Sequence, residues 1–179
     1  MRDDDELRDN PHVSLRALQA VHEDLFGWCL SRCDYEPAAA EDLLQQTYVE
    51  VLSGRARFDA RSALKTFLFG VAHNLARSRY RRKALRLRLL RSYAFTTEVA
   101  TSGSAADIDD DNEKIWRAVA ALPARQRDIT ELVFCRDMTI EQASAVMGVA
   151  VGTGRVHYER AKKALATKLG TMQDWTKTR

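Results

Sequence analysis

The residues whose chemistry is easiest to interpret lie on one face of a helix predicted over residues 150–165. Helical spacing places Val156, Glu159 and Arg160 together on its outer side. In the major groove of DNA, arginine donates two hydrogen bonds to guanine, glutamate accepts one from cytosine N4, and an apolar side chain packs on a thymine methyl. The pattern predicts a helix that reads bases, and the alternative is a solvated, charged helix face. The candidate DNA-reading residues are Arg155, Val156, His157, Glu159, Arg160 and Lys163.

The opposite side of this helix predicts burial. Val151, Gly154, Tyr158, Ala161 and Leu165 follow one another there at spacings of three and four. Gly154 in this stripe either leaves a small hole or lets the helix approach its neighbour closely. Each helical glycine costs about 1 kcal/mol relative to alanine. The first turn is therefore expected to fray in the free protein and to order on DNA.

A second helix must precede the first in order to position it. Thr139 is a good N-cap, and Glu141 and Gln142 follow it in the first turn. Gly148 ends this short helix and starts a tight turn. A short helix, a glycine-containing turn and a second helix make up the helix-turn-helix arrangement.

A separate basic stretch predicts a second contact with a polyanion. Residues 77–91 hold eight basic residues and no acidic residue. Four aromatic residues lie in or near this stretch, and bases of single-stranded nucleic acid stack on such rings while cations follow the backbone. A solvated face is the alternative for the arginines, and Phe67 and Leu68 are expected in the core. The aromatic residues are Phe58, Phe67, Phe69 and Tyr80.

Charge alternates in sign along the chain, which suggests separate surfaces for separate partners. Residues 1–60 carry six basic and thirteen acidic residues, whereas residues 61–91 carry ten basic and none acidic. Residues 92–113 carry six acidic and no basic residues, and residues 114–179 carry twelve basic and six acidic. A basic block of this density is typical of nucleic-acid binding.

Periodicity predicts an all-α fold with two small helical domains joined by a flexible linker. Strand patterns are nearly absent, and helical spacing of apolar residues is widespread. The stretch "TTEVATSGSAADIDDDN" is rich in Ser, Thr, Gly and Asp and predicts an acidic linker. The predicted domains cover residues 1–95 and 113–170, with the linker at 96–112 and a tail at 171–179. The predicted helices cover residues 13–34, 38–53, 62–90, 113–121 and 124–136, followed by the helix-turn-helix pair.

Enzymatic function is not expected from this sequence. The four histidines are scattered, and no glycine-rich phosphate loop follows a strand. No cofactor or metal is expected. Cys29 and Cys33 are interpreted as buried thiols, with a metal or redox site as the alternative. No apolar run is long enough to span a membrane, and the acidic N-terminus does not resemble a secretory signal, so we expect a cytoplasmic protein.

Three stretches of the sequence resemble one family. These are "EDLLQQTYVEVL" at 41–52, "FLFGVAHNLARSRYRR" at 67–82, and the stretch from "LPARQ" to "ERAKKAL" at 122–165. In this order they resemble bacterial sigma-70-type initiation factors of the short, extracytoplasmic-function (ECF) group. The resemblance covers about residues 15–90 and 113–170, with a region 2-like domain first and a region 4-like helix-turn-helix domain second.

The resemblance implies a set of partners and a role for each basic or acidic helix. The partners are core RNA polymerase, through its beta-prime clamp and beta flap, promoter DNA, and an anti-sigma factor. The helix-turn-helix would read the −35 element, and the linker would run toward the active-site and RNA-exit channel. Clamp contacts are expected from Asp42, Gln45, Gln46 and Glu50. Capture of a flipped −10 base is expected from Lys65, Asn74 and Arg77, with Arg79, Arg81 and Arg82 supporting the backbone.

Several residues depart from the family pattern, mostly where the promoter would be read. Gly154 replaces a branched apolar residue, and Val156 and Glu159 replace polar, basic or aromatic residues. Ala150 lacks a capping side chain, and Gln46 replaces an acidic residue in the clamp helix. The alternatives to a sigma factor are a stand-alone helix-turn-helix regulator and a helical protein-interaction adaptor. Neither needs two separate basic faces.

Overall fold

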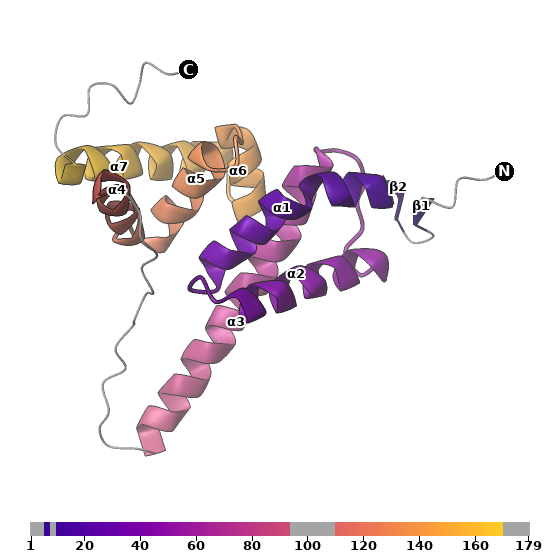
Figure 1. Ribbon diagram of the computed structural model, residues 1–179, viewed down its shortest axis with the longest axis horizontal. Coiled ribbons are helices and arrows are strands. Elements are labelled where there is room, and N and C mark those ends of the chain that lie inside the picture. The colour runs from indigo at the N-terminus through magenta and orange to yellow at the C-terminus, as the bar shows by residue number, and fades with distance from the viewer. Residues whose placement is uncertain (1–5, 8–9, 94–109, 170–179) are drawn as a thin grey trace. The chain divides into compact units, whose positions relative to one another are not determined.

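The computed structural model describes residues 6–7, 10–93 and 110–169, which are almost entirely helical (Figure 1). The chain divides into two compact units, Met1–Ser104 and Ala105–Arg179. The predicted all-α class is confirmed. One small addition is an antiparallel pair of strands, β1 (Glu6–Leu7) and β2 (Asn10–Ser14), which pairs Glu6 with Ser14. These strands are too short to give an alternating pattern in the sequence.

Three helices make up most of the described part of the first unit. They are α1 (Leu15–Arg32), α2 (Pro37–Leu52) and α3 (Leu64–Tyr93). Ser14 caps α1 by accepting a hydrogen bond from the Ala17 amide at 3.2 Å, and a proline opens α2 at a position where no backbone donor is required. The core side chains with little or no exposure include Leu25, Trp28, Leu43, Leu68 and Phe69.

The second half of α3 leaves this core. Figure 1 shows α3 continuing past α1 and α2, and every residue from 80 to 89 is exposed. Leu85 and Leu89 are 59% and 55% exposed, respectively. Within the basic stretch predicted from the sequence, Ser78 and Arg79 are therefore half-buried, whereas residues 80–89 are surrounded by solvent.

The described residues of the second unit, 110–169, form four helices. They are α4 (Asp110–Ala120), α5 (Ala124–Phe134), α6 (Ile140–Met147) and α7 (Val151–Leu169). α4 and α7 share a core of small and aliphatic side chains. The first three residues of α4 fall in the stretch predicted as linker. The rest of that stretch and the tail at 171–179 lie outside the described residues.

The predicted helix-turn-helix is confirmed in detail. The Thr139 hydroxyl accepts from the Gln142 amide at 3.2 Å, and the Gln142 side chain accepts from the Thr139 amide at 2.9 Å. This reciprocal capping box satisfies two amides at the start of α6. Gly148 adopts a left-handed conformation with φ of 62° and ends the helix. Over the described residues, no helix is both long and apolar enough to cross a bilayer.

Candidate nucleic-acid interface

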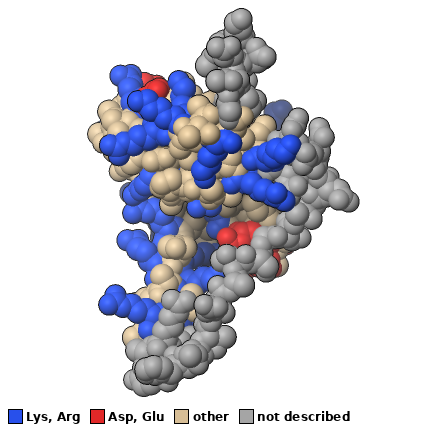
Figure 2. Space-filling model, turned by 90° about the vertical axis from the view of Figure 1, so that its left-hand side faces the viewer, with Lys and Arg blue, Asp and Glu red and all other residues tan. Residues whose placement is uncertain are grey.

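The outer face of α7 is accessible along its length. Val156 is 47% exposed, and Arg155, Glu159, Arg160 and Lys163 are exposed as well. His157 is half-buried. Figure 2 shows one face of the molecule, on which Lys and Arg side chains far outnumber Asp and Glu side chains. The predicted reading residues of α7 are thus accessible from solvent, and only His157 among them is half-buried.

The inner face of α7 is held by a close approach at Gly154. Gly154, Ala161 and Leu165 are buried, as the apolar stripe predicted. A Cβ atom added to Gly154 would lie 1.9 Å from Ser144 Oγ on α6 and 3.3 Å from Ile129 Cδ1 on α5. The glycine therefore allows a tight contact and leaves no hole. Val151, predicted on the same stripe, keeps 37% of its surface exposed and lies at its edge.

Among the described residues, two ion pairs lie on the outer side of α7. Arg155 Nη2 donates to Glu141 Oε1 on α6 at 3.1 Å. Lys162 Nζ lies 3.5 Å from Glu159 Oε1, one turn along α7. All four side chains are largely exposed, so neither pair adds much to the stability of the unit.

The basic face of α3 presents only some of its predicted residues to solvent. Asn74, Arg77, Arg81 and Arg82 are exposed. Lys65 instead forms an ion pair with Asp24 of α1, with Nζ 2.5 Å from Oδ2. Of the residues predicted from the sequence, α3 thus exposes one amide and three guanidinium groups.

The aromatic residues near this basic stretch are mostly unavailable for stacking with bases. Phe69 is fully buried, and Phe67 is half-buried against Phe58 with ring centroids 5.1 Å apart. Leu68 is buried, as expected. Tyr80, at 74% exposed, is the one ring of the predicted four that stands clear of the core.

Arg79 turns inward and joins α3 to α2. Its two terminal nitrogens donate to the Ala39 carbonyl at 3.3 Å and to Gln46 Oε1 at 3.0 Å. Gln46 is one of the residues expected to contact polymerase. Sequence periodicity could not separate Arg79 from its arginine neighbours, because the distinction depends on an acceptor from another helix.

Replacing Arg79 with alanine is expected to lower the free energy of unfolding of the first unit by about 1.5–3 kcal/mol, since two charge-assisted hydrogen bonds are lost. Arg81→Ala is the matched control, because Arg81 is exposed on the same helix. Urea unfolding of both variants, followed by circular dichroism, measures the difference. Equal urea midpoints for the two variants would show that the α2–α3 contact of Arg79 does not contribute to stability.

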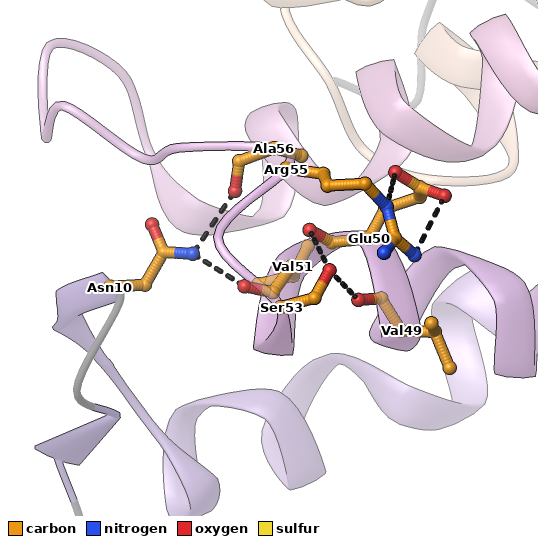
Figure 3. Close-up of polar contacts among 7 residues, drawn as sticks. All are labelled: Asn10, Val49, Glu50, Val51, Ser53, Arg55 and Ala56. Atoms are coloured by element: carbon orange, nitrogen blue, oxygen red, sulfur yellow. Dashed lines mark hydrogen bonds and ion pairs between the residues drawn. The ribbon is translucent and has the colours of Figure 1, made fainter.

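The α2 face carries both polar and apolar exposed residues. Asp42 and Gln45 are exposed, whereas Glu50 accepts two hydrogen bonds from Arg55 at 2.9 and 3.2 Å (Figure 3). Val49 and Leu52 are 50% and 42% exposed on the same helix. Neither residue was predicted from the sequence, although exposed apolar side chains at helical spacing beside Gln45 are typical of an interface.

No disulfide joins the three cysteines. Cys29 is buried, and Cys33 is half-buried with its Sγ 3.4 Å from the Ala39 carbonyl oxygen. Burial raises the pKa of the Cys33 thiol, which disfavours the reactive thiolate. Within the part of the chain that the structure describes, no cluster of three or more His, Cys, Asp or Glu side chains is arranged to hold a metal.

Comparison with known proteins matches both units to one family. Residues 17–86 match sigma-70 region 2, and residues 112–165 match sigma-70 region 4. The ECF sigma factor EcfG of Rhodopseudomonas palustris is 31% identical over 166 residues, which cover 92% of this chain and 86% of EcfG. The sigma factor CarQ of Myxococcus xanthus is 28% identical over 170 residues, covering 93% and 95% of the two chains.

A solved structure resembles the fold across the chain. The sigma factor RpoE of Bartonella quintana, in complex with the anti-sigma factor NepR, superposes with a TM-score of 0.69 at 25% identity. The match covers 88% of this chain and 96% of that one. The structure of CnrH with the cytosolic domain of CnrY is similar in fold, with a TM-score of 0.57 and 22% identity.

The fold and the site together define a class of protein: a two-domain, helical, DNA-binding transcription protein. The chain belongs to the ECF group of sigma-70-family RNA polymerase sigma factors. It is an alternative sigma factor that directs transcription initiation. The match of residues 17–86 to region 2 disfavours a stand-alone helix-turn-helix regulator, which would use only the second unit.

Proposed function

We propose that this sigma factor reads the −35 element with the outer face of α7. The proposal rests above all on the accessible row of Arg155, Val156, Glu159 and Arg160, carried on a capped helix-turn-helix. Residues at the N-terminal end of a recognition helix are those that reach base edges in the major groove. Lys163, which follows this row, and the half-buried His157, which lies within it, supply contacts to the DNA backbone.

The −10 element is assigned to α3. Asn74, Arg77, Arg81 and Arg82 form its exposed polar side, and Tyr80 supplies a ring on which a base can stack. Lys65 and Arg79 support this surface through Asp24 and Gln46. Melting follows when unstacked bases of one strand are held by these groups, which offsets the few kcal/mol that flipping costs.

The α2 face is assigned to the clamp of core polymerase. Asp42, Gln45, Gln46 and Glu50 give it polar and acidic character, and Val49 adds apolar surface. RpoE was solved in complex with the anti-sigma factor NepR, which supports an anti-sigma factor as the regulator of this chain. We assign no catalytic role to the chain itself and place its action in the cytoplasm, where transcription takes place.

Run-off transcription tests the proposal. Core polymerase lacking any sigma factor is expected to give promoter-dependent transcripts from fragments of the source genome only when this chain is added. Arg160→Ala should weaken use of the cognate −35 element by about 1–3 kcal/mol and relax the base preference at one position, if Arg160 contacts a base. A failure to yield any promoter-dependent transcript would contradict the proposal.

A further inference from the structure

Glu141 contacts Arg155, a predicted base-reading residue, but lies outside the recognition helix α7. It lies in the first turn of α6, and its Oε1 accepts from Arg155 Nη2 of α7 at 3.1 Å. We infer that Glu141 is a positioning residue that directs the Arg155 guanidinium toward a base pair of the −35 element. This inference rests on the proposed function of α7.

The carboxylate is itself fixed by the start of α6. The pKa of Glu141 is held below its usual value by a hydrogen bond from its own backbone amide, by Arg155 and by the Thr139 side chain. The group is therefore charged at neutral pH and anchored at a helix N-terminus, where negative charge is favoured. Arg155 is thereby attached to a fixed point on the neighbouring helix.

Folding does not explain why this pair exists. The Arg155 and Glu141 side chains are 65% and 55% exposed, and such pairs contribute little to stability. The Arg155–Glu141 pair instead affects the DNA-bound state. A guanidinium has five N–H donors, so one bond to Glu141 leaves enough donors for a bidentate contact with guanine. Holding the side chain before DNA arrives also lowers the entropy lost on binding.

The Glu141 carboxylate also disfavours a contact of Arg155 with the DNA phosphates. An unrestrained arginine at the start of a recognition helix can turn to the nearest phosphate, and a phosphate contact carries no sequence information. A negative charge beside Arg155 makes that phosphate contact less favourable. Loss of the Glu141 charge should therefore reduce specificity while raising affinity for unrelated DNA, a combination that a purely structural role would not produce.

The test uses holoenzyme assembled from core polymerase and the full chain, on run-off templates with a randomised −35 element. Sequencing of the transcribed templates gives the base preference at each position for wild type, Glu141→Gln and Arg155→Ala. We expect both variants to lose the preference at the same position by at least about fivefold, the lower end of the value of one bidentate contact. The double variant should lose no more at that position than Arg155→Ala alone.

Asp137→Asn is the matched control, because it removes one exposed carboxylate on the same unit outside α6 and α7, and asparagine tolerates the left-handed backbone at this position. It should leave the preference at the Arg155 position intact. Binding to an unrelated duplex should tighten in Glu141→Gln, and circular dichroism should show unchanged helicity and melting.

The outcomes separate this inference from the proposed function. If Arg155→Ala loses the preference and Glu141→Gln keeps it, the positioning role is overturned and the −35 assignment of α7 stands. A uniform decrease on all templates in Glu141→Gln also overturns the positioning role. If wild-type holoenzyme shows no preference at any −35 position, the proposed function itself fails.

Discussion

Gly154→Ala is expected to destabilise the helix-turn-helix unit, although alanine is the better helix former. The new Cβ would lie 1.9 Å from Ser144 Oγ and 3.2 Å from Ser144 Cβ. Ser144 is fully buried and donates to the Ile140 carbonyl at 2.6 Å, so its hydroxyl cannot turn away without losing a buried hydrogen bond. Overpacking costs about 1–3 kcal/mol. The higher helix propensity of alanine offsets about 1 kcal/mol of this cost. We expect a net loss of up to about 2 kcal/mol in the free energy of unfolding.

Hydrogen exchange of peptides from α5, α6 and α7 measures this loss, with peptides from α1 and α2 as the internal reference. Transcription by the holoenzyme should also decrease in this variant, because α7 must move outward relative to α6 to accommodate the methyl group. The change acts on the position of the helix, so every −35 sequence should be affected to a similar degree. This separates Gly154 from the residues that contact bases.

Gly152→Ala provides the control on the same helix. No atom lies within 4 Å of a Cβ built at Gly152, so this substitution should be neutral or stabilising by up to about 1 kcal/mol. Ser144→Ala in the Gly154→Ala background removes the clashing oxygen and should recover part of the lost stability. Equal stability of the Gly152 and Gly154 variants would show that α6 and α7 do not depend on this close approach.

Local signals in the sequence predicted most of the fold. Thr139 and Gly148 mark the ends of α6 by capping chemistry that acts over three or four residues, and both positions proved correct. The buried side of α7 follows from the spacing of Gly154, Ala161 and Leu165 for the same reason. Helical period is a property of neighbouring residues, so one sequence is enough to recognise it.

Contacts between distant residues could not be predicted in this way. Arg79 looks like its neighbours in the basic stretch, and only the packing of α3 on α2 gives it Gln46 as a partner. The Glu141–Arg155 pair depends on how α6 crosses α7. Lys65 likewise has its acceptor 41 residues away, on Asp24. The residues that support the site were therefore found only in the structure, while the exposed residues expected to contact DNA followed from the sequence.

Asn10→Ala is expected to have the largest effect on the first unit. Asn10 is 1% exposed, and its Nδ2 donates to the carbonyls of Val51 at 2.5 Å and Ala56 at 3.0 Å (Figure 3). Its Oδ1 accepts from the Phe58 amide at 2.8 Å. One side chain thus satisfies the C-terminal end of α2 and two backbone groups of the loop that leads to α3. No periodic pattern in the sequence distinguishes this asparagine.

The alanine variant leaves two carbonyls and one amide without this partner, at a cost of about 1–3 kcal/mol for each group that water cannot reach. A total near 3 kcal/mol would accelerate exchange of the Phe58 amide by about a hundredfold, since 1.4 kcal/mol corresponds to a factor of ten. His12→Ala is the control, because His12 is exposed on the same strand and should leave that amide protected. Glu50 and Arg55 flank the loosened segment, so polymerase binding should weaken as well, without any change in −35 base preference. If the Phe58 amide exchanges equally fast in both variants, then β2 does not hold the loop, and the α2 end must be stabilised from within the helix.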